Sequence, residues 1–288
     1  MASGKPYPPG VLERLQKTEL EILSIIDKIC RENGFRYFIM GGNLLGAVRH
    51  GGFIPWDDDL DIGMPWDDYC RFREAAPSLL PDGYSMHDNL NTKGFSAMWT
   101  KIFKDGTLFM DEVAVESGHQ QAIFLDILPF HQLAADEKIA WRQCRRGLFW
   151  QRMSYLHHMA HPHIPANTSL RPLKVFGCVA IHYTVAQLFS PESLKRHWLN
   201  QYEADYPLGT KWMNMSCTYN ELLDEVTLFP TGEIDYDGLT VCAPHDIKAF
   251  LGSAFKGDYM TPPPMEDRYT HLPEVLDFGD GINVMEGW

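Results

Sequence analysis

Membrane-spanning stretches are missing from the sequence. The longest apolar stretch, residues 173–189, is interrupted by Lys174, His182 and Gln187, whereas a spanning helix needs about 18 apolar residues in a row. We expect this stretch to form a buried helix, with a helix lying on a membrane surface as the alternative. The first ten residues, MASGKPYPPG, also lack the apolar core of a secretory signal. A cytoplasmic location is therefore expected.

Cysteine pairs and an excess of bases are missing as well. The six cysteines lie far apart and none belongs to a CxxC pair, which argues against a disulfide framework or a zinc ribbon and favours a reducing compartment. The 25 bases are outnumbered by 38 acids, so the formal net charge is −13. Such a charge argues against a sequence-independent grip on nucleic acid, and we expect no nucleic-acid partner.

The few bases are unevenly distributed along the chain. Residues 138–196 contain nine bases and one acid, Glu192, a local charge of +8. The remainder has 16 bases and 37 acids, a charge of −21. This asymmetry predicts an anionic partner for the basic segment, such as a lipid-linked glycan met at the inner face of the membrane. Pairing of these bases with the acidic remainder of the chain is the alternative.

The hydrophobic periodicity predicts one large α+β domain. With 288 residues and 45% hydrophobic residues, the chain can bury a sizeable core. The expected helices cover residues 9–32, 43–49, a segment opening at 65, most of 136–206, and 244–256. The expected strands cover residues 36–40, 57–64 and 122–128, with hairpins at 97–110 and 228–244. We expect a mixed sheet core over about 9–135 and 207–288, with a helical insertion at about 136–206.

The segment with the clearest chemistry is FIMGGNLLGAVRHGGFIPWDDDLDIGM, residues 38–64. In a strand, residues two apart share a face, so Asp59 and Asp61 are expected to project together, and Asp57 with them if the strand begins early. Four carboxylates within residues 57–61 repel one another unless a cation neutralises them. Mg²⁺ is the natural candidate, since it favours carboxylates combined with substrate phosphates, and Mn²⁺ is an alternative.

A glycine pair and a further acid complete the predicted site. Gly41 and Gly42 let the backbone approach a ligand closely, and the helix that follows aims free N–H groups at an anion. Asp126 is the one acid in the apolar stretch AIFLDILPF. Because an unpaired acid in an apolar strand is costly, we interpret Asp126 as a third metal ligand.

This arrangement of strand, Gly-Gly, short helix and Asp-x-Asp strand resembles the active site of the nucleotidyltransferase superfamily. The stretch GGNLLGAVRHGGFIPWDDDLDIGM, together with the tail LTVCAPHDIKAFLGSAFKGDYMTPPPMEDRYTH, is similar to the LicD family. This family includes bacterial phosphocholine transferases and shares its core with the fukutin-related proteins. The resemblance covers about residues 35–131 and 239–271.

The resemblance implies a transferase reaction. A phosphoryl-linked alcohol would pass from a CDP donor to a hydroxyl of a cell-surface glycan precursor, with release of CMP. Choline, ethanolamine, glycerol and ribitol share this phosphate chemistry, so the alcohol stays open. Asp59, Asp61 and Asp126 would hold Mg²⁺ against the diphosphate. Asp57 or Asp58 would accept the proton of the acceptor hydroxyl.

The remaining candidates are assigned to the donor and the acceptor. Gly41, Gly42, Asn43 and Arg49 would hold the donor phosphates, with Lys101 as a further phosphate contact and a solvated lysine as its alternative. Candidate donor or acceptor contacts are His50, Trp56, Tyr259 and His271. Trp56, Trp66, Trp99 and Tyr259 could form an aromatic box for a quaternary ammonium, although core packing is the simpler use of each.

Competing interpretations remain for the site and for the histidines. One interpretation of the four histidines His157, His158, His161 and His163 is a zinc site. No cysteine or acid lies at ligand spacing nearby, so contact with an anionic acceptor is the preferred interpretation. The rival reactions are nucleotidyl transfer from a nucleoside triphosphate, with release of pyrophosphate, and simple binding on an inactive transferase core.

Overall fold

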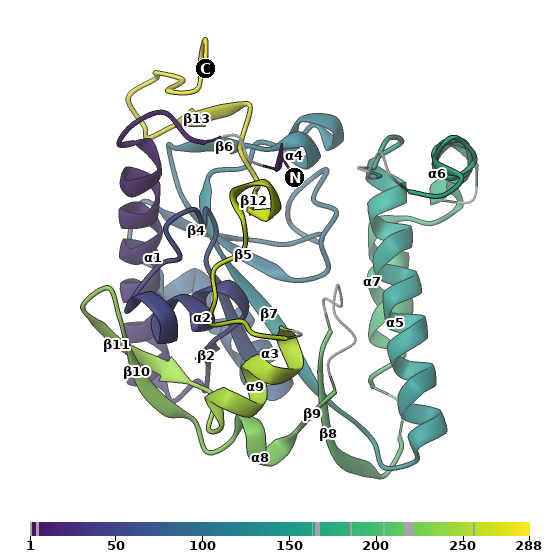
Figure 1. Ribbon diagram of the computed structural model, residues 1–288. Coiled ribbons are helices and arrows are strands. Elements are labelled where there is room, and N and C mark those ends of the chain that lie inside the picture. Colours follow the sequence, from purple (N-terminus) through teal and green to yellow (C-terminus); the bar gives the residue numbers. More distant parts are fainter. Residues whose placement is uncertain are drawn as a thin grey trace.

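The computed structural model describes the backbone of residues 2–3 and all of residues 6–162, 164, 168–184, 186–203, 205–215, 222–255 and 257–288 (Figure 1). A mixed sheet and its covering helices form the larger part, and a group of helices stands beside it. The α+β class expected from the sequence is confirmed.

Within the described residues the main sheet has seven strands, ordered β2-β3-β7-β5-β4, with β8 added to β7 and β9 added to β8. Of these described strand pairs, β3 and β7 run parallel and the others are antiparallel. The strands are β2 (Phe38–Ile39), β3 (Asp61–Pro65), β4 (Tyr84–His87), β5 (Thr100–Lys104), β7 (Ile123–Ala134), β8 (Leu208–Asn214) and β9 (Leu222–Asp224).

Three small two-stranded sheets lie outside the main one. β10 (Gly232–Tyr236) and β11 (Leu239–Ala243) form the hairpin expected near the C-terminus. β1 (Ala2–Ser3) pairs with β12 (Tyr269–Thr270), and β6 (Leu108–Met110) pairs with β13 (Val275–Asp277). The two latter pairings join chain segments far apart in sequence and bring the C-terminal segment across the sheet.

The helices match most of the predicted positions. They are α1 (Val11–Asn33), α2 (Gly41–His50), α3 (Trp66–Leu79), α4 (Glu112–Ser117), α5 (Glu137–His158), α6 (Arg171–Tyr183), α7 (Pro191–Leu199), α8 (Glu225–Leu228) and α9 (Ile247–Ala254), with short 3₁₀ turns at Ala186–Leu188 and Met265–Asp267. α1 ends at Gly34, whose left-handed backbone lets its N–H bond the carbonyl of Cys30.

Two hydrophobic cores hold the described chain together. The larger one lies around the main sheet and includes α1, α2, α3 and α9. The smaller one lies between β8 and the helices α5 and α7, around the fully buried Trp198. α5 packs against α6, α7 and β7, so the helical group is attached to the sheet through the long strand β7 (Figure 1).

Several sequence expectations are wrong in detail. The predicted hairpin at 97–110 does not form: β5 pairs with β4 and β7, whereas β6 leaves the sheet and pairs with β13. The strand expected over 57–64 begins only at Asp61. α6, part of the stretch expected to be buried, has no buried residue. The pairing partner of β6 lies more than 160 residues away, which local sequence patterns do not encode.

Among the described residues, no single helix has both the length and the apolar character of a membrane span. The segments Arg171–Leu188 and Pro191–Leu199 meet these criteria only when taken together, and they are bent by 88°.

Candidate active site

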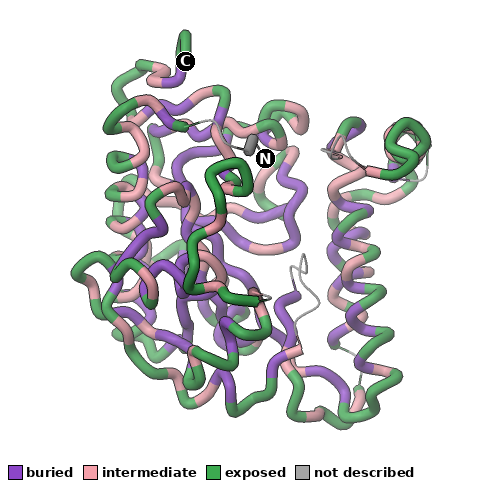
Figure 2. The backbone as a smooth tube through the Cα atoms, in the orientation of Figure 1, coloured by how far each residue is buried: buried purple, intermediate pink, exposed green. Residues whose placement is uncertain are grey.

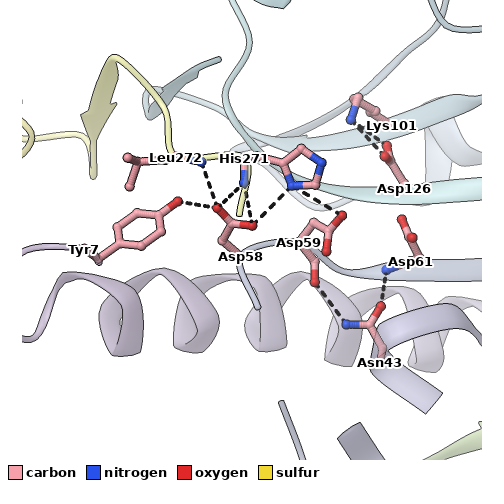
Figure 3. Close-up of polar contacts among 9 residues, drawn as sticks. All are labelled: Tyr7, Asn43, Asp58, Asp59, Asp61, Lys101, Asp126, His271 and Leu272. Atoms are coloured by element: carbon pink, nitrogen blue, oxygen red, sulfur yellow. Dashed lines mark hydrogen bonds and ion pairs between the residues drawn. The ribbon is translucent and has the colours of Figure 1, made fainter. Parts of the chain in front are cut away.

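The centre of the candidate site is a row of charged side chains across three neighbouring strands. Asp61, the first residue of β3, lies opposite Asp126 of the parallel strand β7, and Asp126 lies opposite Lys101 of β5. In-register neighbours on adjacent strands share one face of a sheet. Lys101 Nζ lies 2.8 Å from Oδ1 and 2.9 Å from Oδ2 of Asp126 (Figure 3). The structure thus brings these predicted residues together.

Asp59 reaches the same site from the loop that precedes β3. The side chain of Asn43 fixes this loop: its Nδ2 donates to the carbonyl of Asp59 at 3.0 Å, and its Oδ1 accepts from the N–H of Asp61 at 2.7 Å (Figure 3). Asn43 Nδ2 also donates to the hydroxyl of Tyr236. Since the Asn43 amide is engaged in this way, its side chain positions the acidic loop and is not available to hold a phosphate.

The glycine pair lies directly against the acids. Gly41 has a left-handed backbone with φ +55°, and a Cβ there would lie 3.9 Å from Oδ2 of Asp61. A Cβ on Gly42 would lie 2.9 Å from Oδ2 of Asp57, closer than a Cβ tolerates. The pair therefore allows the start of α2 to close onto the carboxylates. A phosphate at this point would meet negative charge unless a cation lay between them.

Asp58 has a different environment from its neighbours. Its carboxylate is buried and accepts hydrogen bonds from the Tyr7 hydroxyl at 2.7 Å and from the backbone N–H groups of His271 and Leu272 at 2.8 and 3.0 Å (Figure 3). His271 Nδ1 lies 3.2 Å from Asp58 and 3.6 Å from Asp59. Asp58 therefore ties the C-terminal segment to the acidic loop, which does not fit the predicted role of proton acceptor.

The protonation equilibria follow these contacts. Burial and then the neighbouring carboxylates Asp59 and Asp126 hold the pKa of Asp61 well above its usual range. Burial raises the pKa of Asp58, but the hydrogen bonds and charge of His271 outweigh it and the net pKa is lowered. Burial alone would lower the pKa of His271, yet Asp59 and Asp58 raise it to about 10. The site thus contains more carboxylate than its two cations neutralise.

Glu19 is an acid of this cluster that the sequence analysis did not include. It lies on the buried stripe of α1, is 1% exposed, and its Oε2 has no hydrogen-bond partner among the described residues. Burial, followed by the charges of Asp59 and Asp58, raises its pKa well above the usual range. The sequence does contain an indication of this role, because Glu19 is the one acid among the apolar positions of the predicted first helix.

A cavity of about 410 Å³ opens over the acidic row, by which we mean Asp61 and Asp126 with Lys101 beside them. Asp59, Asp61, Asp126, Lys101 and His271 form its polar floor. Its walls come from the loop before β5, from α4 and from the end of α5, and they include Phe95, Trp99, Phe124, Tyr155, Met159, Asp111 and His119. The cavity gives a ligand access to the acids. The wall residues other than Trp99 were missed because they come from segments scattered along the chain.

Several predicted residues do not line this cavity: Gly41, Gly42, Asn43 and Asp58 border the acids from outside it, and four others make their contacts elsewhere. Arg49 is at the far end of α2 from Gly41, where it donates to the carbonyl of Tyr259 at 2.7 Å and to the ring of His50. Trp56 is stacked by Arg268, whose guanidinium carbon lies 3.9 Å from the ring centre. None of Arg49, His50, Trp56 and Tyr259 lines the cavity. Of the suggested aromatic box, only Trp99 does so.

The histidine cluster does not form a metal site among the described residues. His157 and His158 each place Nδ1 at 2.9 Å from a backbone carbonyl, and His161 bonds Glu116. His163 lies outside the described residues. In the described part of the chain, the group whose ligand atoms all lie within 4.8 Å of one another is Asp58, Asp59 and His271.

The acidic site is compatible with a divalent metal ion. The Asp58, Asp59 and His271 group satisfies the spacing of a metal site, but Asp58 is already saturated by hydrogen bonds and His271 shares its Nδ1 with it. Asp61 and Asp59 have carboxylates that face the cavity. Hard oxygen ligands of this kind suit a divalent cation, and the burial and neighbouring carboxylates that raise the pKa of Asp61 would also favour a cation beside it.

Part of the chain is similar to a known family of proteins. The model of the LicD/FKTN/FKRP nucleotidyltransferase domain matches residues 34–173. The lipopolysaccharide cholinephosphotransferase LicD of Haemophilus influenzae is 31% identical over 131 residues, 44% of this chain and 48% of that protein. The ribitol 5-phosphate transferase FKRP is 28% identical in Mus musculus over 163 residues and in Homo sapiens over 159, 28% of each protein. The chain thus spans half or less of the length of these relatives.

Proposed function

Because residues 34–173 belong to the LicD/FKTN/FKRP nucleotidyltransferase family, we propose that this chain is a transferase that moves an alcohol phosphate onto a glycan hydroxyl. The donor in this proposal is a CDP-linked alcohol, and CMP is released. The observation that carries the proposal is the row of Asp61, Asp126 and Lys101 at the floor of a cavity of about 410 Å³. The activities for which the relatives are named, cholinephosphotransfer and ribitol 5-phosphate transfer, support this substrate class.

The proposed site is dependent on Mg²⁺, or on Mn²⁺ in its place. Asp59, Asp61 and Asp126 would hold the ion. The ion would supply charge neutralisation for the donor diphosphate and for the leaving CMP. Lys101 keeps Asp126 oriented through its 2.8 Å ion pair, and Asn43 fixes the backbone on either side of Leu60 so that Asp59 and Asp61 stay in place.

The donor phosphates are assigned to the start of α2. Gly41 and Gly42 leave no side chain between the helix start and the carboxylates of Asp61 and Asp57, and the first N–H groups of a helix attract anions. The carboxylates attract cations, whereas the first N–H groups of α2 attract anions, and both lie at the same place. A metal ion held by the acids would satisfy the carboxylates and the phosphates together.

The acceptor is assigned to the side of the cavity formed by α4 and α5. This wall contributes polar groups, Asp111 and His119, beside the aromatic Tyr155, a mixture that suits a sugar with both hydroxyls and apolar faces. Burial and the charge of Lys101 lower the pKa of His119 to about 4, so it is neutral at pH 7. Neither Asp57 nor Asp58 lines the cavity, and neither is proposed as the proton acceptor.

The test combines binding and product analysis. The protein is melted with CDP-choline, CDP-ribitol, CDP-glycerol and CTP, each with and without Mg²⁺. A CDP-alcohol that raises Tm only with Mg²⁺ supports the proposal, since a ligand stabilises the fold in proportion to its affinity. The products formed with that donor and a glycan acceptor are then separated.

The products distinguish the rival functions. CMP without pyrophosphate supports alcohol-phosphate transfer. Pyrophosphate from CTP would instead establish nucleotidyl transfer. Metal-dependent binding without turnover of any CDP-alcohol, by transfer or by hydrolysis, would establish a binding protein on an inactive transferase core and overturn the proposal.

A further inference from the structure

The outward side of α6 is apolar. At 3.6 residues per turn, one side of this helix carries Pro172, Leu173, Phe176, Val179, Ala180 and Tyr183. Leu173, Phe176 and Tyr183 are 64%, 70% and 68% exposed. The opposite side faces the protein, where His182 Nδ1 lies 2.8 Å from the carbonyl of Leu156 and Ile181 packs on the smaller core. α6 is therefore an amphipathic helix whose apolar side has no partner among the described residues.

The outward side of the neighbouring helix α5 is basic and aromatic. Its exposed residues between positions 138 and 152 are Lys138, Trp141, Arg142, Arg145, Arg146, Phe149 and Arg152. Trp141 and Phe149 are 44% and 53% exposed. No acid interrupts this stripe. α5 packs against α6, and exposed residues follow both helices on the flank away from the sheet (Figure 2).

The bases of this surface are not used inside the molecule. Within the described residues, no ion pair joins Lys138, Arg142, Arg145, Arg146 or Arg152 to an acid. The alternative raised for the sequence, that these bases pair with the acidic remainder of the chain, therefore does not hold for α5. Five of the nine bases in residues 138–196 lie exposed on α5, whereas the rest of the chain outside that segment has a charge of −21.

We propose that the outward faces of α5 and α6 form a docking surface for an anionic lipid membrane. The apolar side of α6 would enter the boundary between headgroups and acyl chains, the arginines of α5 would meet lipid phosphates, and Trp141 and Phe149 would sit at the interface. The acidic remainder would be repelled by the same lipids, which fixes the orientation of the bound protein. This goes beyond the proposed reaction and does not depend on it.

Charge excludes a second copy of the chain as the favoured occupant. In a two-fold dimer the same patch meets itself, so the arginines of one α5 would oppose those of the other. Like charges facing each other across an interface are unfavourable. An anionic surface has the opposite charge and also accepts the apolar side of α6.

Vesicle co-sedimentation of the full chain tests the docking surface without any substrate. Vesicles of phosphatidylglycerol and phosphatidylcholine are compared with vesicles of phosphatidylcholine alone. We expect binding to the anionic vesicles that weakens at high salt, since the arginines contribute by charge. The double variant Leu173→Gln/Phe176→Gln should lose at least tenfold in affinity, and the triple variant Arg142→Gln/Arg145→Gln/Arg146→Gln should lose a similar factor together with the salt dependence.

Matched variants on the sheet side serve as controls. Val226→Gln/Ile282→Gln removes exposed apolar side chains of 72% and 61% exposure, and Lys17→Gln/Lys28→Gln/Lys248→Gln removes three exposed bases. Neither should change vesicle binding. All variants should melt like the parent, because the substituted residues are exposed. The proposal is overturned if the parent does not bind anionic vesicles, or if the α6 variant binds them as the parent does. It is overturned as well if the α6 variant instead abolishes a dimer seen by ultracentrifugation.

Discussion

The acidic site gathers like charges in a largely buried cluster, whereas the helical flank exposes its like charges to water. Glu19 and Asp57 to Asp61 lie close together and largely out of water, with His271 and Lys101 as nearby cations. The arginines of α5 stand apart in water without ion-pair partners among the described residues. Exposed charges cost little free energy, whereas buried like charges are expensive. The acidic site is therefore compatible with a bound cation, which would lower this cost. The flank carries no such cost, and only the apolar side of α6 beside its charges points to a ligand there.

The largest expected effect is loss of transfer on neutralising the acidic row. Asp61→Asn or Asp126→Ala should lower turnover at least a hundredfold, about 2.7 kcal/mol of barrier, because each removes a proposed metal ligand. Asp61→Asn should leave Tm unchanged or raise it, since the raised pKa of Asp61 means that its charge is unfavourable in the fold. Turnover is measured at saturating Mg²⁺, with the exposed Glu266→Gln as a control. Near-normal turnover of the Asp61 variant would refute its assignment.

Substitution of the neighbouring Asp58 should instead lower the stability of the fold. Asp58→Ala removes the acceptor of hydrogen bonds from Tyr7, His271 and Leu272 and leaves His271 without its closest partner. Breaking a buried charge pair costs about 3 kcal/mol or more, so urea unfolding should show a loss of that size. If Asp58→Ala were as stable as the parent, the C-terminal segment would not depend on this carboxylate.

Local patterns predicted which elements carry the candidate residues better than they predicted how these elements connect. The apolar stripe of α1, the Gly-Gly start of α2 and the acid of β7 were all readable, because each depends on residues a few positions apart. Asp59 was expected on the strand, yet β3 begins at Asp61, and the amide of Asn43 fixes the turn between them. Alternation alone does not show where a strand starts.

The partners of Asp58 could not be predicted from the sequence. Tyr7 and His271 lie 51 and 213 residues away from it, and only the folded chain brings them together. The same is true of β6 and β13. The exposure of α6 was misjudged for a related reason: apolar composition indicates that a face avoids water, but it does not indicate whether protein or another partner covers that face.

The free energy of unfolding should change with pH in opposite directions through groups of the two regions. At the acidic site the raised pKa of Glu19 means that the folded state keeps a proton that the unfolded state releases above pH 4, so this group lowers stability as pH rises from there. In the helical group, burial lowers the pKa of Lys195 to about 7. Between pH 7 and 10 the unfolded state binds the proton and the folded state does not, so Lys195 raises stability with pH.

Lys195→Met measures that second contribution. Lys195 is 3% exposed and its Nζ donates to the carbonyl of Met98 at 2.6 Å, so methionine keeps the packing and removes the titration. The free energy of unfolding should climb with pH between 7 and 10 by up to about 1.4 kcal/mol per unit more in the parent than in the variant. Urea unfolding at pH 7, 8.5 and 10 gives the difference. Parallel profiles for the two proteins would show that Lys195 does not titrate in this range.

The smallest expected effect is a change in the KM for the acceptor when bases of the flank are replaced. Replacing Arg142, Arg145 and Arg146 with glutamine should raise the KM for a membrane-embedded acceptor a few-fold and weaken its dependence on salt. The KM for the CDP donor should stay the same, because the acidic site lies on the sheet and these arginines contact none of its residues. Tm should also stay the same, since no ion pair among the described residues is lost. With an acceptor freed of its lipid, both KM values should equal those of the parent, because the flank then has nothing to bind. A rise in KM for the lipid-free acceptor would instead place these arginines in contact with the glycan itself.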